Sequence, residues 1–162
     1  MLWKIILVFL VSMVPLIELR GAIPIAVGMG VELPEWAILI IAIIGNLIPV
    51  PFIYLFARKV LEWGSTKCKK PKTFKKFCTF CLKKGEKAGD KLLKKAGRGT
   101  YFALYLFVAI PVPGTGAWTG TLAASILKLD FKKTMISIVA GVITAGLIML
   151  LVSLGLFKVL FA

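Results

Sequence analysis

The sequence predicts an all-α integral membrane protein with two inverted repeats, each a re-entrant helical hairpin plus a transmembrane helix, and a basic amphipathic cytoplasmic segment between them. Three observations lead to this fold class. The 162 residues are 59% hydrophobic, with a mean hydropathy of +0.95, and the apolar residues form long runs. Most of the basic charge lies in one central block, and the two halves of the chain resemble each other. Apolar runs of this length exclude an ordinary soluble domain.

The predicted division of the chain has three parts. Each hairpin breaks in a stretch rich in Gly and Pro, and each spanning helix can cross a bilayer at about 1.5 Å per residue. The parts are the first repeat, 1–57 (re-entrant hairpin 2–31, transmembrane helix 36–57), the basic cytoplasmic amphipathic segment, 58–100, and the second repeat, 101–162 (re-entrant hairpin 101–127, transmembrane helix 134–157).

The first hairpin carries two charges inside apolar sequence. Glu18 and Arg20 interrupt a run too short for a full span of about 20 residues, and Gly21 and Pro24 mark a helix break. A charge at the centre of a bilayer costs at least about 2.5–3.5 kcal/mol, so such groups usually pair or face a cavity. The stretch is either the polar tip of a re-entrant hairpin or a charged loop at the membrane surface.

The helix predicted at 36–57 contains 22 residues without a charge. Asn46 and the Pro49-Val50-Pro51 sequence interrupt it. Because proline lacks the N–H that a helix needs, we expect a kink or a partly unwound turn there.

The central block sets the expected orientation. Fifteen basic and three acidic residues lie between Arg58 and Arg98, which gives +12 of the net charge of +14. Basic loops beside membrane spans stay in the cytoplasm and attract anionic lipid. This explanation of the charge leaves no need for a nucleic-acid partner, and we expect none.

The same block holds every cysteine of the chain. An odd number of cysteines on the reducing side indicates free thiols, and the spacing of Cys78 and Cys81 resembles that of zinc ligands. The chain has no His, and zinc would need another ligand beyond Cys68, so we expect no metal and no cofactor. Phe74 and Phe77 share a helical face with Cys81, which indicates an amphipathic helix on the membrane surface or, alternatively, a solvated loop.

The second hairpin breaks in the sequence PVPGTGAWTG, residues 111–120. Two prolines and three glycines in ten residues cannot continue a helix. Basic residues flank the hairpin at both ends, so both ends should lie in the cytoplasm. The last span, 134–157, contains small residues that allow close helix packing.

The two halves align when the chain is shifted by 95 residues. Gly21-Ala22 then falls on Gly116-Ala117, and Glu35-Trp36 falls on Asp130-Phe131. One span separates the halves, so the basic-residue rule makes the repeats inverted. Inverted repeats with broken helices near the midplane are typical of secondary transporters.

The ELRGAIP sequence at 18–24 and the PVPGTGAWTG sequence at 111–120 resemble the two signatures of the small multidrug export proteins. That family is similar to the DedA superfamily, and the resemblance covers nearly the whole chain. It implies two facing re-entrant hairpins and transport or scrambling of lipid phosphates such as undecaprenyl phosphate. The chain lacks the arginine-rich motif typical of DedA members near the second hairpin, where it has Thr115 and Thr119.

Arg20 is the residue expected to bind the substrate. Its guanidinium could hold a phosphate headgroup through paired donors. Glu18 could orient Arg20 or exchange a coupling proton or cation, but a salt bridge between the two that only locks the turn is an alternative. The remaining residues offer neutral hydrogen bonds or shape the turns. The predicted substrate-binding residues are Arg20, Glu18, Gly21, Pro24, Asn46, Pro111, Pro113, Gly114, Thr115, Gly116 and Thr119.

Three function classes fit these features. The first is a transporter or flippase that moves a lipid phosphate or similar amphiphilic anion across the cytoplasmic membrane. Such a protein would cross the membrane several times, contact membrane lipids, and could form a homo-oligomer. The second is a proton- or cation-coupled small multidrug exporter, and the third is a scaffold whose basic segment recruits a partner. We expect no enzyme, because the chain lacks His and a nucleophile with an evident base.

Overall fold

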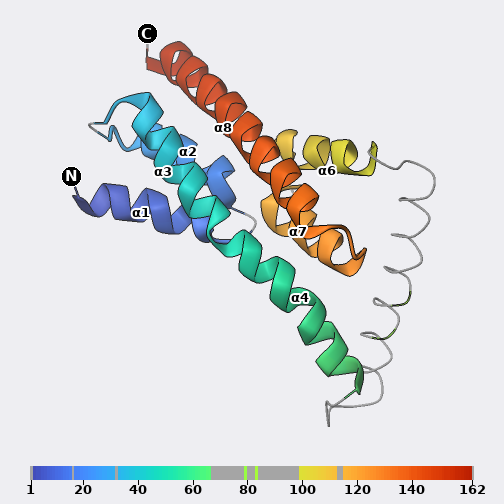
Figure 1. Ribbon diagram of the computed structural model, residues 1–162. Helices are drawn as coiled ribbons and strands as arrows, with labels where there is room; N and C mark the ends of the chain where they lie inside the picture. Colours follow the sequence, from blue (N-terminus) through green and yellow to red (C-terminus); the bar gives the residue numbers. More distant parts are fainter. Residues whose placement is uncertain are drawn as a thin grey trace.

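The protein is described by a computed structural model (Figure 1). It describes residues 2–15, 17–31, 33–66, 79, 83, 99–112 and 115–161. Within these ranges every regular element is a helix, as predicted. The helices are α1 (Leu2–Met13), α2 (Glu18–Gly28), α3 (Glu35–Leu47), α4 (Pro49–Thr66), α6 (Gly99–Ala109), α7 (Ala117–Ile126) and α8 (Phe131–Phe161).

Helices α1 and α2 form a tight pair at the start of the chain. The backbone N–H groups of Val14 and Glu18 bond back to Val11 and Val14, so the chain turns within a few residues. At the other end of the pair, the Lys4 ammonium donates to the Met29 carbonyl at 3.0 Å and ties the start of α1 to the end of α2. A cation here satisfies carbonyls that have no partner inside α2.

The predicted break in the first long helix is confirmed between α3 and α4. Helix α3 ends at Leu47 and α4 begins at Pro49, where a missing N–H costs nothing because the first helical N–H groups have no intrahelical partner. Figure 1 shows the two helices following one another along one line, with α8 beside α3. Helix α4 continues to Thr66, beyond the predicted end of the span at residue 57.

Among the residues that the structure describes, two stretches are long and apolar enough to cross a membrane. They are Glu35–Trp63, with 29 residues, and Phe131–Leu156, with 26. Only 28% and 33% of their most apolar windows are buried in the protein, and side chains such as Ile136 and Leu151 are about 70% exposed (70% and 71%). An apolar surface of this extent suits lipid rather than water.

Small residues bring the helices close together, as the composition of the last span predicts. A Cβ added to Gly141 of α8 would lie 2.7 Å from the Val108 Cβ of α6, and one added to Gly146 would lie 2.8 Å from Leu39 of α3. At the centre of the core, Leu19 and Ile23 of α2, the helix that packs against α8, are almost fully buried. The amphipathic helix predicted around Phe74, and the three cysteines, lie outside the described residues.

Candidate functional site

The two polar stretches that the sequence singles out meet in the structure. Glu18 and Arg20 begin α2, directly after the turn that follows α1. Both side chains reach the segment between α6 and α7, about 90 to 100 positions further along the chain (|i−j| of 88 to 100). The turn between α1 and α2 therefore packs against the segment that joins α6 to α7.

Glu18 caps the N-terminus of α7. Its carboxylate accepts hydrogen bonds from the backbone N–H groups of Ala117 (3.3 Å) and Trp118 (3.0 Å), the first two residues of that helix. These N–H groups have no partner inside the helix, and the helix dipole favours an anion in front of them. Glu18 is only 4% exposed, so this pairing is what compensates for burying its charge.

Arg20 caps the opposite end of the interruption, the C-terminus of α6. One terminal nitrogen donates to the Val112 carbonyl and to Thr115 Oγ1 (3.0 Å). The other donates to the carbonyls of Val108 (3.1 Å) and Ile110 (3.0 Å). Carbonyls at a helix C-terminus carry partial negative charge and lack intrahelical donors, so a cation is favoured there.

The pair therefore neutralises both ends of a broken helix. The sequence left two roles open for Arg20, a phosphate ligand or a salt bridge with Glu18. In the structure each charge instead bonds to the 108–118 segment, and the terminal nitrogens of Arg20 make four hydrogen bonds to protein oxygens. In this arrangement the anion in front of α7 is Glu18 itself.

The backbone at the contact takes unusual conformations. Gly116 has φ = +155°, and a Cβ there would lie 2.7 Å from Glu18 Oε1, so only glycine lets the carboxylate approach α7. Glu18 has φ = +51°, a region that costs a non-glycine residue on the order of 1–3 kcal/mol. Strain of this size persists only where surrounding contacts stabilise it, and the two bonds to α7 do so.

Other predicted residues support this contact rather than line an open site. Thr115 accepts from Arg20, and its hydroxyl lies within bonding distance of the Val112 (2.8 Å) and Ile110 (2.9 Å) carbonyls. Thr119 Oγ1 lies 3.4 Å from the Gly116 carbonyl. Pro24 stands inside α2, where it removes the N–H that would otherwise bond the Arg20 carbonyl.

The remaining predictions divide into three groups. Gly21 follows Arg20 in α2 and leaves room for the Ile17 side chain, and Pro111 is half-buried in the α6–α7 segment. Asn46 lies in α3, is 1% exposed, and its side-chain oxygen has no hydrogen-bond partner among the described residues. It takes no part in the bonds of Glu18 and Arg20. Pro113 and Gly114 are outside the described residues.

Sequence reasoning missed the backbone groups that receive the two charges. A helix that resumes after the glycines of the 111–120 stretch has an N-terminus that attracts anions, and this signal points to the Ala117 and Trp118 N–H groups. The anion was expected to be the substrate rather than Glu18. Trp118 also carries a buried indole N–H that has no hydrogen-bond partner in the described part of the chain.

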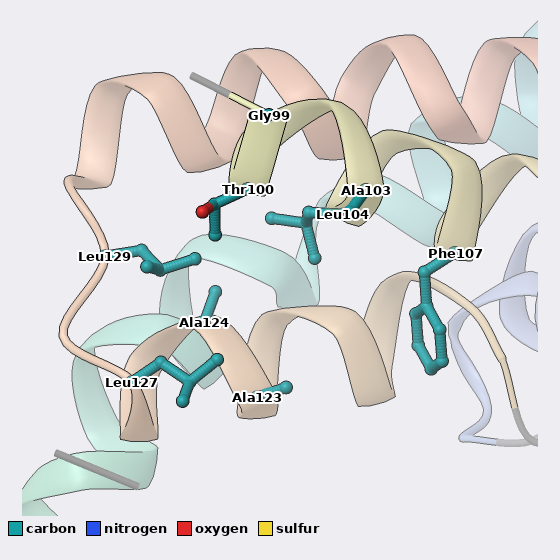
Figure 2. A pocket seen from close by; sticks show the side chains of 9 residues that line it. All are labelled: Gly99, Thr100, Ala103, Leu104, Phe107, Ala123, Ala124, Leu127 and Leu129. Carbon is teal, nitrogen blue, oxygen red and sulfur yellow. The ribbon is translucent and has the colours of Figure 1, made fainter. Parts of the chain in front are cut away.

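Two hollows lie on either side of α7. A cavity of about 230 Å³ separates α6 from α7 (Figure 2) and is almost entirely apolar. A more open cleft of about 450 Å³ lies between α4 and α7, with Lys59, Glu62 and Lys128 in its lining. Ser125 donates to the Tyr54 carbonyl at 2.7 Å, and the Tyr54 hydroxyl donates to the Leu129 carbonyl, so α4 is held against α7 beside that cleft.

Comparison with known proteins gives one match. The family described as "Putative small multi-drug export protein" matches residues 18–148, a range that contains Glu18, Arg20 and the whole α6–α7 segment. No curated protein and no solved structure matches the chain.

Proposed function

Because the chain belongs to the family of small multi-drug export proteins, we propose that it moves amphiphilic anions, such as a lipid phosphate, across the cytoplasmic membrane. The export description of the family and the exposed apolar helices support transport in a membrane. The anionic substrate is supported by one observation, the carboxylate that Glu18 places in front of α7. The lipid part of the proposal rests on the sequence likeness to the DedA superfamily.

We infer a mechanism in which the substrate replaces Glu18. The N-terminus of α7 is an anion site, and a phosphate group offers the same charge and more acceptor oxygens than a carboxylate. When the phosphate displaces Glu18, Arg20 can exchange its carbonyl partners for phosphate oxygens through its paired donors. Loss of both caps would loosen the contact between the first and second helix pairs and let them move apart.

Glu18 also provides a coupling device. In its charged form it competes with the substrate for the Ala117 and Trp118 N–H groups. Protonation would remove that charge and weaken its bonds to α7, so a proton arriving at Glu18 would favour substrate entry. This is the role we propose for a coupling proton.

We propose that α1–α2 and α6–α7 are the two re-entrant hairpins of an inverted repeat. Several features recur in both halves. Gly30 and Lys128, at the ends of α2 and α7, both have positive φ (55° and 56°). Gly45 packs on Phe9 of α1 as Gly141 packs on Tyr105 of α6. Helix α4 packs on α7, while α8 packs on α2, which is the exchange that a two-fold relation produces.

A second candidate is export of cationic drugs, which the family description favours. In that case a cation would bind the Glu18 carboxylate after it leaves α7, and Arg20 would keep the α6 end capped. The two candidates differ in the sign of the transported charge, so they can be separated directly.

The experiment is a liposome assay with purified protein. Vesicles containing the wild type, Arg20→Gln, Glu18→Gln or the control Lys59→Gln are tested with a fluorescent lipid phosphate and with a cationic dye. We expect lipid phosphate transport by the wild type and the control and its loss in Arg20→Gln. Wild-type lipid transport by a folded Arg20→Gln protein would reject the proposal. Dye export that is lost only in Glu18→Gln would favour drug export instead.

A further inference from the structure

The cavity between α6 and α7 is partly open, since Ala103, Phe107 and Ala123 in its lining are exposed, and the Glu18–Arg20 contact does not use it. Its walls come from one face of each helix, and Figure 2 shows these side chains pointing toward one another across it. Thr100 and Leu129 lie at one end of the cavity, and Phe107 lies at the other. The other lining side chains named here are Ala103 and Leu104 of α6 and Ala123, Ala124 and Leu127 of α7.

The cavity suits hydrocarbon rather than water. Thr100 supplies the only side-chain oxygen among its lining residues. An apolar cavity of about 150 Å³ stays dry and binds benzene or xenon. At about 230 Å³ this cavity is larger, so it can hold part of an alkyl chain.

The surroundings of the cavity are also apolar. Phe102 on α6 is 62% exposed, and Leu106 on the same helix and Leu122 on α7 are exposed as well. In a membrane protein such side chains face the lipid. A chain that enters the cavity would therefore come from a membrane lipid.

Basic charge collects next to the Thr100 end. The turn that contributes Leu127 and Leu129 to the cavity also carries Lys128, and Lys132 and Lys133 follow at the start of α8. All three lysines are exposed. The Lys133 ammonium lies 5.7 Å from the centre of the ring of Tyr101, the residue that follows Thr100 in the sequence. The one acid in this turn, Asp130, already accepts the Lys133 backbone N–H at 3.0 Å.

We propose that this site binds an anionic phospholipid, with one acyl chain in the cavity and the phosphate beside Lys132 and Lys133. The apolar walls select the chain, and the lysines select the charge of the headgroup. The lipid is a resident ligand that joins the two arms of the α6–α7 pair. It is not the transported molecule, so the site does not depend on which substrate the protein moves.

The test measures lipid retention by native mass spectrometry. Purified protein is incubated with phosphatidylglycerol or with phosphatidylcholine of the same chains. Ala123→Phe and Ala103→Phe fill the cavity from exposed positions that line it, and Leu122→Phe adds a ring at an exposed neighbour outside it. The double variant Lys132→Gln/Lys133→Gln removes the headgroup contact, and thermal unfolding confirms that each variant is folded.

We expect the wild type and Leu122→Phe to retain phosphatidylglycerol, and either cavity-filling variant to bind it at least about tenfold more weakly, a loss of about 1.4 kcal/mol or more. The lysine variant should bind the two lipids equally. Unchanged retention by both Ala123→Phe and Ala103→Phe would overturn the proposal, as would an equal loss in Leu122→Phe. Because no transport is measured, failure of the proposed transport function would leave this result unaffected.

Discussion

The Glu18 carboxylate lies against the Cα of Gly116, at a place where any larger residue would collide with it. A Cβ on Gly116 would stand 2.7 Å from Glu18 Oε1. The absent side chain thus allows the carboxylate to reach the first N–H groups of α7. The contact and the two charges that form it lead to three predictions about Gly116, Glu18 and Arg20.

Gly116→Ala should destabilise the protein. The new methyl group would push Glu18 away from Ala117 and Trp118. An alanine backbone would also have to adopt a φ that favours glycine, and the combined cost to the stability is about 1–3 kcal/mol. Thermal unfolding in detergent measures the effect. The matched control is Gly155→Ala, because Gly155 lies in α8 with no atom within 4 Å of an added Cβ, and alanine there should be neutral or slightly stabilising. Equal melting temperatures for the two variants would contradict the packing role of Gly116.

Glu18→Gln should also lower stability, by about 1–2 kcal/mol, since the amide keeps one acceptor but loses the charge that favours the helix N-terminus. Chemical unfolding of both proteins under the same conditions measures the loss. Equal stability of the two proteins would argue against a charge-based cap.

Arg20→Lys should lower both the stability of the protein and its transport of lipid phosphate. Lysine keeps the charge, but it lacks the planar set of donors that reaches the Val108, Ile110 and Val112 carbonyls together. We expect a drop of about 2–4 kcal/mol in stability and loss of lipid phosphate transport in the liposome assay. Variants that lose stability but, once folded, transport normally would restrict Arg20 to a structural role.

The basic segment 60–100 and the turn 128–133 should lie in the cytoplasm, with Glu32 and Glu35 outside. The asymmetry of Lys and Arg is the reason. The measurement is labelling of single cysteines by an impermeant reagent in intact cells, in a background whose native cysteines are replaced by serine. Glu35→Cys should react and Lys83→Cys should not. The reverse pattern would invert the orientation and leave the repeat unaffected.

Much of the local structure follows from the sequence. The break between α3 and α4 falls at the predicted Pro49, the turn after α6 falls in the stretch of prolines and glycines, and α7 begins at Ala117 within that stretch. These features depend on missing N–H groups and on backbone freedom, which are properties of single residues. The sequence also indicates that Glu18 and Arg20 need partners, because burying an unpaired charge is costly.

The identity of those partners depends on the packing of distant segments. Glu18 and Arg20 bind backbone N–H and C=O groups 88 to 100 positions away, apart from one bond to Thr115. Every residue except proline carries both of these backbone groups, so no residue pattern identifies which of them will receive a charge. Which helix ends lie beside α2 is set by how the helices fit together at positions such as Gly116 and Gly141.

The register between the two halves shows the same limit. A single shift of 95 pairs Gly21 with Gly116, whereas α2 and α7 end 98 positions apart, at Gly28 and Ile126, and α3 and α8 begin 96 positions apart, at Glu35 and Phe131. The step from 98 to 96 arises because the connection from α7 to α8 is two residues shorter than that from α2 to α3. Composition and charge thus determine the helices, their breaks and the need to neutralise the buried Glu18 and the half-buried Arg20. The pairing of those charges with particular helix ends comes from the three-dimensional packing, because it depends on connection lengths and close contacts that no local pattern encodes.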